Sequence, residues 1–222
     1  MDLMDQQAEN GGFPDYRRGS VERDAAELRA DVLLEFLEAA IHTTLHARGM
    51  FERRRAYEVP VWMSRHPELN EYIAQALANA RPLLVERLLH RVYLCFKREN
   101  GAIEESFVFE LQESDDAPAG PITLDAVTEL EAHLRAVLVK INMSGAALPS
   151  REGCTFSLLI GCAGAGAATA RAAAAAGDKW LVSDAQDGRP AGELRVVPVR
   201  SVRVPHFRLQ AYALVAAPEE EL

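Results

Sequence analysis

The spacing most suggestive of chemistry in this sequence is that of several glycines in a small-residue tract. The tract begins Gly161-Cys-Ala-Gly164-Ala-Gly166-Ala-Ala-Thr169, and Asp184 ends the next apolar run. A dinucleotide-binding fold uses such glycines to bring the backbone close to a pyrophosphate at a helix N-terminus. Here Thr169 stands in place of the third glycine, and too little chain follows to complete a doubly wound sheet. A nucleotide-binding enzyme with Gly164 and Gly166 in its loop therefore stays only an alternative.

Two other groups of residues could bind a ligand. His42 and His46 lie one helical turn apart, a spacing that can hold a metal ion. Position 43 is not Glu and no third ligand is close in sequence, so we expect a solvated helix face instead. Arg53-Arg54-Arg55 could contact phosphate, but three basic residues beside a strand are typical of a charged edge. Since no serine or cysteine has the context of a nucleophile, the sequence predicts no catalytic site, metal or cofactor.

The composition argues against several classes of function. A formal net charge of -9 argues against direct nucleic acid binding, which normally needs an excess of Lys and Arg. The three cysteines lack paired spacing, which indicates a reducing compartment. No stretch approaches the roughly 20 apolar residues of a membrane span. We expect one domain at residues 26–216, between a flexible polar leader at 1–25 and an acidic tail at 217–222.

Three segments have the periodicity of amphipathic helices. In the first, at residues 26–48, one apolar face is formed by Leu33, Phe36, Leu37, Ala40, Ile41 and Leu45. Polar residues lie largely elsewhere on it: Asp31, Glu35, Glu38, His42 and His46. A second helix begins near Pro67, and Pro82 is expected to bend or restart it. The third begins at Asp125, and we expect Glu131 and Arg135 to form an exposed pair beside its apolar stripe.

The remaining apolar runs predict strands. Tyr57, Val59 and Val61 alternate with other residues, but Pro60 restricts this run to an edge or end strand. Asn100-Gly101 lies between apolar runs at 92–96 and 106–109, which is typical of a β-hairpin. Further strand-like runs lie at 154–160, 180–182, 194–204 and 207–215. Because no βαβ unit repeats, the predicted fold class is α+β with a mainly antiparallel sheet.

Two long blocks and three later patches resemble one family. The blocks are Ala30-Asp-Val-Leu-Leu-Glu-Phe-Leu-Glu38 and Tyr57-Glu-Val-Pro-Val-Trp-Met-Ser-Arg-His-Pro-Glu-Leu-Asn-Glu-Tyr-Ile73. The patches are Phe107-Val-Phe-Glu110, Gly153-Cys-Thr-Phe156, and Trp180 followed by Asp184-Ala-Gln-Asp187. In this order they resemble the HORMA-domain accessory subunit of translesion DNA polymerase zeta, within the mitotic arrest-deficient-like HORMA family. The resemblance implies a HORMA fold and a non-catalytic adaptor in DNA damage tolerance and repair.

The resemblance also implies a way of binding peptides. In a HORMA fold a C-terminal safety belt, here within about residues 162–216, closes over a partner peptide that lies against the sheet. A peptide added to a sheet edge gains backbone hydrogen bonds, and its release from a closed belt requires local unfolding. Tyr72 and Trp180 match family residues that contact the clasped peptide. That peptide is expected to contain proline and to belong to the catalytic subunit of polymerase zeta.

Further surfaces and partners follow from the same resemblance. Val196, Gln210 and Tyr212 match a surface that binds the C-terminal domain of the translesion scaffold polymerase. Arg135 matches a position at the dimer surface shared with another HORMA protein. The resemblance also implies a AAA+ remodelling ATPase as a partner, and a nuclear or additionally cytoplasmic location. A spindle-checkpoint or other cell-cycle HORMA adaptor, which clasps mitotic partners with the same belt, is the alternative within the fold.

Overall fold

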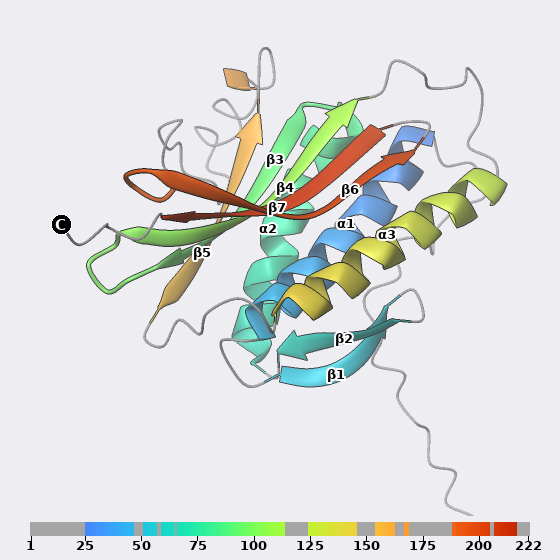
Figure 1. The fold of residues 1–222 in the computed structure, drawn as a ribbon. Helices are drawn as coiled ribbons and strands as arrows, with labels where there is room; N and C mark the ends of the chain where they lie inside the picture. Colours follow the sequence, from blue (N-terminus) through green and yellow to red (C-terminus); the bar gives the residue numbers. More distant parts are fainter. Residues whose placement is uncertain are drawn as a thin grey trace, which may run out of the picture.

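The computed structural model describes residues 25–46, 51–56, 59–64, 66–113, 124–145, 154–162, 167–168, 188–204 and 207–216. A five-stranded antiparallel sheet is covered on one face by helices (Figure 1), which confirms the α+β prediction. Its strands are β3 (Leu89–Lys97), β4 (Ile103–Glu113), β5 (Thr155–Cys162), β6 (Leu194–Val204) and β7 (Phe207–Ala216).

β5 and β6 follow each other in the sequence but lie at opposite edges of the sheet. Across the sheet the order is β5-β3-β4-β7-β6, and every neighbouring pair is antiparallel. The chain that leaves β5 at Cys162 must therefore reach the far edge before it enters β6 at Leu194. At about 4.8 Å between strands, this crossing spans about 19 Å.

The β3–β4 hairpin confirms the prediction made from Asn100-Gly101. Gly101 has a φ of +82°, in the left-handed region where a side chain would be strained. The Asn100 side-chain oxygen accepts a hydrogen bond from the Ala102 N–H at 3.0 Å. These two residues therefore supply what a tight turn between two strands requires.

The core lies between the sheet and α1 (Ala25–Leu45). Alternate residues of the central strands point toward the helices and are fully buried, among them Leu94, Phe107, Phe109 and Leu209. Phe36 of α1 meets Phe109 edge to face, with ring centroids 6.1 Å apart. The apolar face predicted for α1 is buried as expected.

The prediction of a solvated face on α1 was wrong. Asp31, Glu35, Glu38 and His42 are buried, because α1 contacts α2, α3 and β2 as well as the sheet. Burial lowers the pKa of His42 to about 4, so its imidazole is neutral at physiological pH. Burial also lowers the pKa of His46, which is only half-buried.

The helix α2 (Pro67–Val85) runs without a break through Pro82, so the expected restart does not occur. Pro82 lies in the last turn, where its missing N–H removes a single helical hydrogen bond, while its own carbonyl still accepts from the Glu86 N–H at 3.0 Å. Arg81 of this helix donates from Nε to Asp31 Oδ1 of α1 at 2.9 Å. The buried Asp31 carboxylate is thus partnered by a cation from the neighbouring helix.

A second, two-stranded sheet lies on the far side of the helices (Figure 1). It pairs β1 (Phe51–Ala56) with β2 (Val59–Ser64), and Pro60 lies opposite Arg55. The predicted strand around Val59 and Val61 therefore exists. Arg53-Arg54-Arg55 form part of β1 itself, and that strand was missed because three successive arginines show no alternation.

Several sequence predictions fall outside the described residues. They concern the polar leader, the acidic tail, most of the small-residue tract with Gly164 and Gly166, and the positions Asp184 and Trp180. Among the helices that are described, none has the length and apolar character needed to span a membrane.

Candidate functional site

The two edges of the large sheet differ in charge and shape. β6 carries Pro198, a register shift between Pro198 and Arg200, and the exposed Arg195 and Arg203, which hinder the addition of another strand. β5 has the sequence Thr-Phe-Ser-Leu-Leu-Ile-Gly-Cys, with no charged residue and no proline. Within the described ranges, β5 pairs with β3 alone. An extended peptide can therefore join the sheet at β5.

Tyr72 lies at this β5 edge. Its side chain is 45% exposed, and its ring meets Phe156 of β5 edge to face with centroids 6.0 Å apart. The N–H of Leu158 donates a hydrogen bond to the Tyr72 hydroxyl oxygen at 3.4 Å. The structure thus places Tyr72 beside the open strand, whereas its contact with a partner peptide stays a prediction.

The chain enters β6 across the face of the sheet that points away from the helices. Gly188 lies against the ring of Tyr93 of β3 so closely that a Cβ there would come within 3.0 Å of ring carbons. The buried Cys95 thiol donates to the Gly188 carbonyl oxygen at 3.9 Å. A glycine is therefore needed at position 188 to hold this segment against the outer face of β3.

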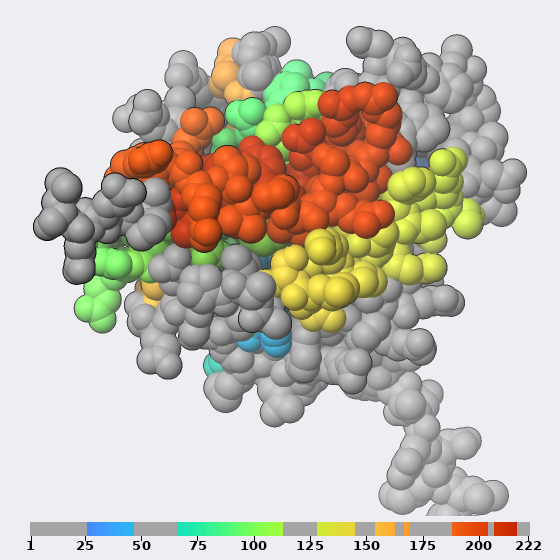
Figure 2. All heavy atoms as spheres, in the orientation of Figure 1, coloured from blue at the N-terminus to red at the C-terminus, as the bar shows by residue number. Residues whose placement is uncertain are grey.

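A hollow of about 540 Å³, here called the outer hollow, lies where β6 and β7 border this same face. It is lined by Glu110, Arg189, Leu194, Val196, Pro198, Val199, Arg200, Ser201, Gln210, Ala211, Tyr212 and Leu214. Figure 2 shows β6 and β7 at the molecular surface, with α3 (Leu124–Gly145) beside them. The structure brings together the three residues that the resemblance assigned to the second interface: Val196, Gln210 and Tyr212.

The alternation of β7 explains why these residues meet. Phe207, Leu209 and Ala211 are buried on the helix side, so Gln210 and Tyr212 point to the outer face, as the sequence predicts. The register pairs Tyr212 with Pro198 of β6 and brings the 56% exposed Val196 opposite Leu214.

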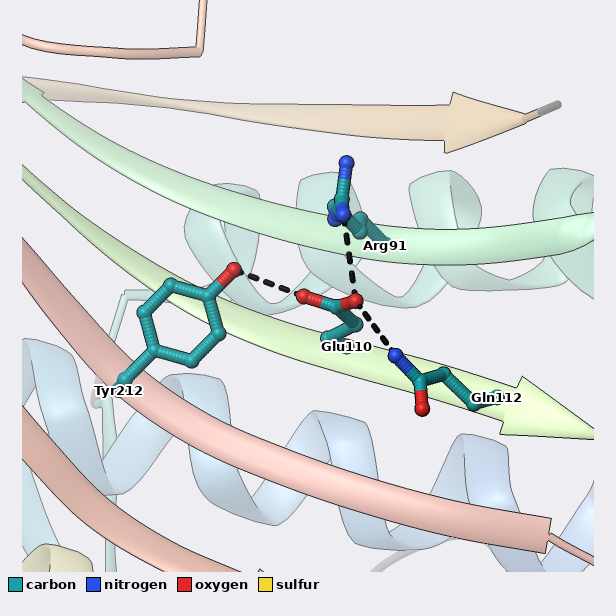
Figure 3. A network of polar contacts seen from close by, with 4 residues as sticks. All are labelled: Arg91, Glu110, Gln112 and Tyr212. Carbon is teal, nitrogen blue, oxygen red and sulfur yellow. Dashed lines mark hydrogen bonds and ion pairs between the residues drawn. The ribbon is translucent and has the colours of Figure 1, made fainter.

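A polar network holds Tyr212 in place at the outer hollow (Figure 3). Its hydroxyl donates to Glu110 Oε2 at 2.9 Å, while Arg91 Nη2 and Gln112 Nε2 donate to Oε1 at 3.1 and 2.9 Å. The three side chains come from β3, β4 and β7 and converge on one carboxylate. Such convergence fixes the ring of Tyr212, whose hydroxyl proton is directed at the Glu110 carboxylate.

The network also sets the charges of its members. Burial would raise the pKa of Glu110, but the hydrogen bonds from Arg91, Tyr212 and Gln112 outweigh it and lower the pKa below 4.5. Burial and the hydrogen bond to Glu110 raise the pKa of Tyr212 to about 12. The hydrogen bond to Glu110 likewise raises the pKa of Arg91. At neutral pH the network is therefore carboxylate, guanidinium and neutral phenol.

We expect Glu110→Gln to lower the free energy of unfolding by about 1 kcal/mol at pH 7, because its charged hydrogen bonds are partly exposed. The lowered pKa of Glu110 means that its stabilisation is present above pH 4.5 and is lost as pH falls through the folded-state pKa. Urea unfolding between pH 7 and pH 3 should show a smaller loss of stability for the variant than for the wild type. Equal losses in the two proteins would contradict this role of the carboxylate.

Arg135 lies on α3, and its side chain is half-buried. The expected exposed pair with Glu131 is not exposed, since Glu131 is half-buried too. The cause is the packing of α3 against α1 and β6. On the same helix Val139 and Met143 are exposed apolar residues, the latter at 67%. α3 therefore presents an apolar strip next to Arg135.

Sequence reasoning missed the charged partners of Tyr212. Glu110 belongs to a patch that carried the resemblance, and its alternation with Phe107 and Phe109 could have placed it on the outer face. The pairing of Glu110 with Gln210 across β4 and β7, and with Arg91 across β3, depends on a register that no local pattern reveals. Over the described ranges, no cluster of His, Cys, Asp and Glu could hold a metal ion.

Comparison with known proteins finds relatives of two kinds, spindle-checkpoint proteins and subunits of DNA polymerase zeta, according to their names. It is 34% identical over 191 residues to "Mitotic spindle assembly checkpoint protein MAD2B" of Bos taurus, covering 82% of this chain and 89% of that protein. It is 32% identical over 124 residues to "DNA polymerase zeta subunit 2" of Drosophila melanogaster, covering 53% and 60%. A third relative, "DNA polymerase zeta processivity subunit" of Arabidopsis thaliana, is 33% identical over 117 residues, covering 50% and 53%. No family model matches the chain.

Solved structures share the fold at low sequence identity. A chain of the crystal structure of the mitotic checkpoint complex superposes with a TM-score of 0.68 at 16% identity, covering 85% of this chain and 99% of that one. C. elegans HTP-2 bound to HTP-3 closure motif 1 gives 0.68 at 10% identity, covering 87% and 88%. These neighbours are HORMA-domain proteins, so the predicted HORMA fold is confirmed.

Proposed function

Because the chain belongs to the MAD2B family of HORMA-domain proteins, we propose that it is an accessory subunit of DNA polymerase zeta and an adaptor without catalytic activity. One partner is the catalytic subunit, which supplies an extended, proline-containing peptide. The other is the C-terminal domain of the translesion scaffold polymerase. The assembly acts in DNA damage tolerance and repair in the nucleus, and a AAA+ ATPase remodels it.

The open β5 strand is the observation that carries this proposal. It is uncharged, it lacks a neighbour on its outer side in the described part of the fold, and Tyr72 lies beside it. β6, at the other edge, is protected by proline and arginine, so the sheet accepts a new strand at one edge and rejects it at the other. The chain leaves this open strand at Cys162 and lies against Tyr93 of β3 at Gly188. These two end points support a belt role for the residues between them.

Calorimetric titration with overlapping peptides that tile the catalytic subunit tests the first partner. One proline-containing segment should bind, with one peptide per chain. Proline suits this site because its ring restricts the free peptide to extended conformations, which lowers the entropy lost on binding. If no peptide of the catalytic subunit binds, the proposed function is wrong.

The second partner is assigned to the outer hollow. That hollow lies at the β6–β7 side of the sheet, whereas the open strand β5 forms the opposite edge. The strand of the hollow nearest to β5 is β4, which carries Glu110 and lies two strands, or about 10 Å, away. Two partners can therefore bind together, which is what an adaptor requires.

Dimerisation with another HORMA protein is assigned to α3. Arg135 lies beside the exposed Val139 and Met143, and apolar residues next to an arginine are common at protein interfaces. We expect Arg135→Ala to weaken self-association while the melting temperature changes little, because partly exposed charges contribute about 0–1 kcal/mol to folding. Light scattering of wild type and variant, each with bound peptide, measures the effect.

Lys140→Ala is the matched control for Arg135→Ala. It removes the same charge from an exposed position on another side of α3, so it should leave self-association unchanged. A wild type that stays monomeric with peptide, or an Arg135→Ala variant that dimerises as well as the wild type, would refute the assignment.

A cell-cycle adaptor is the second candidate, since the mammalian and fish relatives carry a spindle-checkpoint name. This function would use the same open strand and differ in the peptide that is clasped. Pull-down from synchronised cells, followed by mass spectrometry, separates the two. Recovery of polymerase subunits supports the first function, and recovery of mitotic regulators alone supports the second.

A further inference from the structure

The amide of Leu158 faces the open edge of the sheet. Leu158 lies opposite Leu94 in the antiparallel β3–β5 ladder, where the N–H groups of successive residues point alternately toward and away from the neighbouring strand. Its N–H donates to the Tyr72 hydroxyl, which comes from α2 and not from β3. By the same alternation the Ile160 N–H also faces outward, while the Leu159 N–H faces β3.

This edge amide needs an acceptor. The Leu158 residue is only 6% exposed in total, and in such surroundings a backbone N–H without a hydrogen-bond partner costs free energy. In the structure that acceptor is the phenol oxygen of Tyr72. A peptide that joins β5 would bring a backbone carbonyl to the same place, and a proline residue retains that carbonyl although it lacks an N–H.

We propose that the Tyr72 hydroxyl caps the Leu158 amide while the β5 edge is vacant, and that a clasped peptide replaces it with a backbone carbonyl. The proposal rests on the proposed function, because the peptide is the one that the open strand binds. Tyr72 then has two separable roles. Its ring, held against Phe156, forms a surface for the peptide, and its hydroxyl closes the edge until the peptide arrives.

The geometry allows Tyr72 to give up this hydrogen bond. At 3.4 Å the contact is long, and the side chain is 45% exposed, so its hydroxyl can turn to water when a carbonyl takes its place. The ring contact with Phe156 does not depend on the hydroxyl. Tyr72→Phe therefore removes the cap and keeps the aromatic surface, whereas Tyr72→Ala removes both.

Residue-resolved amide hydrogen exchange on the full chain tests the proposal. In the peptide-free protein, Tyr72→Phe should speed exchange at Leu158 about 2- to 10-fold, the range that a typical hydrogen bond supplies, and leave Leu159 unchanged. The probe is the proline-containing peptide of the catalytic subunit that binds the wild type. It should slow exchange at Leu158 and Ile160 to the same level in wild type and Tyr72→Phe. Because the hydroxyl no longer competes for the Leu158 amide, Tyr72→Phe should bind this peptide up to about tenfold more tightly than the wild type.

Three results would overturn the proposal. One is unchanged exchange at Leu158 in peptide-free Tyr72→Phe. Another is a peptide that binds without slowing exchange at Leu158. The third is a Tyr72→Phe variant that binds peptide ten times more weakly, since the hydroxyl would then contact the peptide itself. If no peptide binds any variant, the proposed function fails and the replacement step fails with it, while exchange in the peptide-free protein still reports the cap separately.

Discussion

Replacing both Gln210 and Tyr212 with alanine should abolish detectable binding of the C-terminal domain of the scaffold polymerase. Both side chains line the outer hollow, and Tyr212 is held there by Glu110. Truncating a buried aromatic at an interface commonly costs about 2 kcal/mol or more. With the loss of the Gln210 amide, the affinity should fall by more than about 100-fold, which calorimetry with the isolated partner domain can measure.

Two further variants show whether this loss is local. Arg208→Ala alters a neighbouring residue of β7 that does not line the outer hollow, so binding should persist. Tyr212→Phe keeps the ring and removes only the hydrogen bond to Glu110, so a smaller loss is expected. Clasping of the catalytic-subunit peptide should survive in all three proteins. A double variant that loses both partners would show misfolding or one shared site.

Tyr72→Ala and Trp180→Ala should each weaken capture of the catalytic-subunit peptide by at least about tenfold. Tyr72 presents an exposed ring beside the open strand, and Trp180 is assigned to the belt by the resemblance alone. A tenfold loss corresponds to about 1.4 kcal/mol, a modest share of what a buried aromatic contributes to an interface. Dissociation should accelerate more than association slows, because interface changes act mainly on the off-rate. Stopped-flow or surface kinetics can measure both rates.

Melting temperatures of the peptide-free proteins distinguish a clasp from a core residue. A tryptophan in the core would cost about 3–5 kcal/mol when truncated, whereas a belt residue would leave stability nearly intact. Glu71→Ala, at an exposed neighbouring position on α2, is the matched control for Tyr72→Ala and should release peptide at the wild-type rate. A Trp180→Ala protein that melts far earlier, or one that releases peptide normally, would remove Trp180 from the clasp.

Local patterns predicted the elements whose signals are confined to short segments. The Asn100-Gly101 turn, the apolar face of α1 and the alternation of β7 each depend on residues close in sequence, and each was confirmed. β1 was missed because Arg53-Arg54-Arg55 hide any alternation, although those residues pair with β2.

Polar residues on α1 show where local patterns fail. Asp31 and His42 have the spacing of a solvated face, yet tertiary neighbours bury that face as well. The partner of Asp31 is Arg81, fifty residues away in sequence, so no helical period could have revealed the pair. A helix with contacts on all sides can carry charges when another element supplies their counter-ions.

The candidate site was predicted only in part for the same reason. The resemblance gave Val196, Gln210 and Tyr212, and the structure brings all three to one hollow. Glu110 and Arg91 join them only through the registers of β4 with β7 and of β3 with β4. Registers are set by the pairing of whole strands, and a single sequence does not display that pairing.

Mass measurement of a mixture of the full chain, its catalytic-subunit peptide and the C-terminal domain of the scaffold polymerase tests the adaptor role most directly. The open strand is one edge of the sheet, and the outer hollow lies on the outer face over β4, β7 and β6, so both partners should bind at once. We expect a ternary complex with one copy of each partner per chain, from which Gln210→Ala with Tyr212→Ala removes only the scaffold domain. Mutually exclusive binding of the two partners would contradict the account.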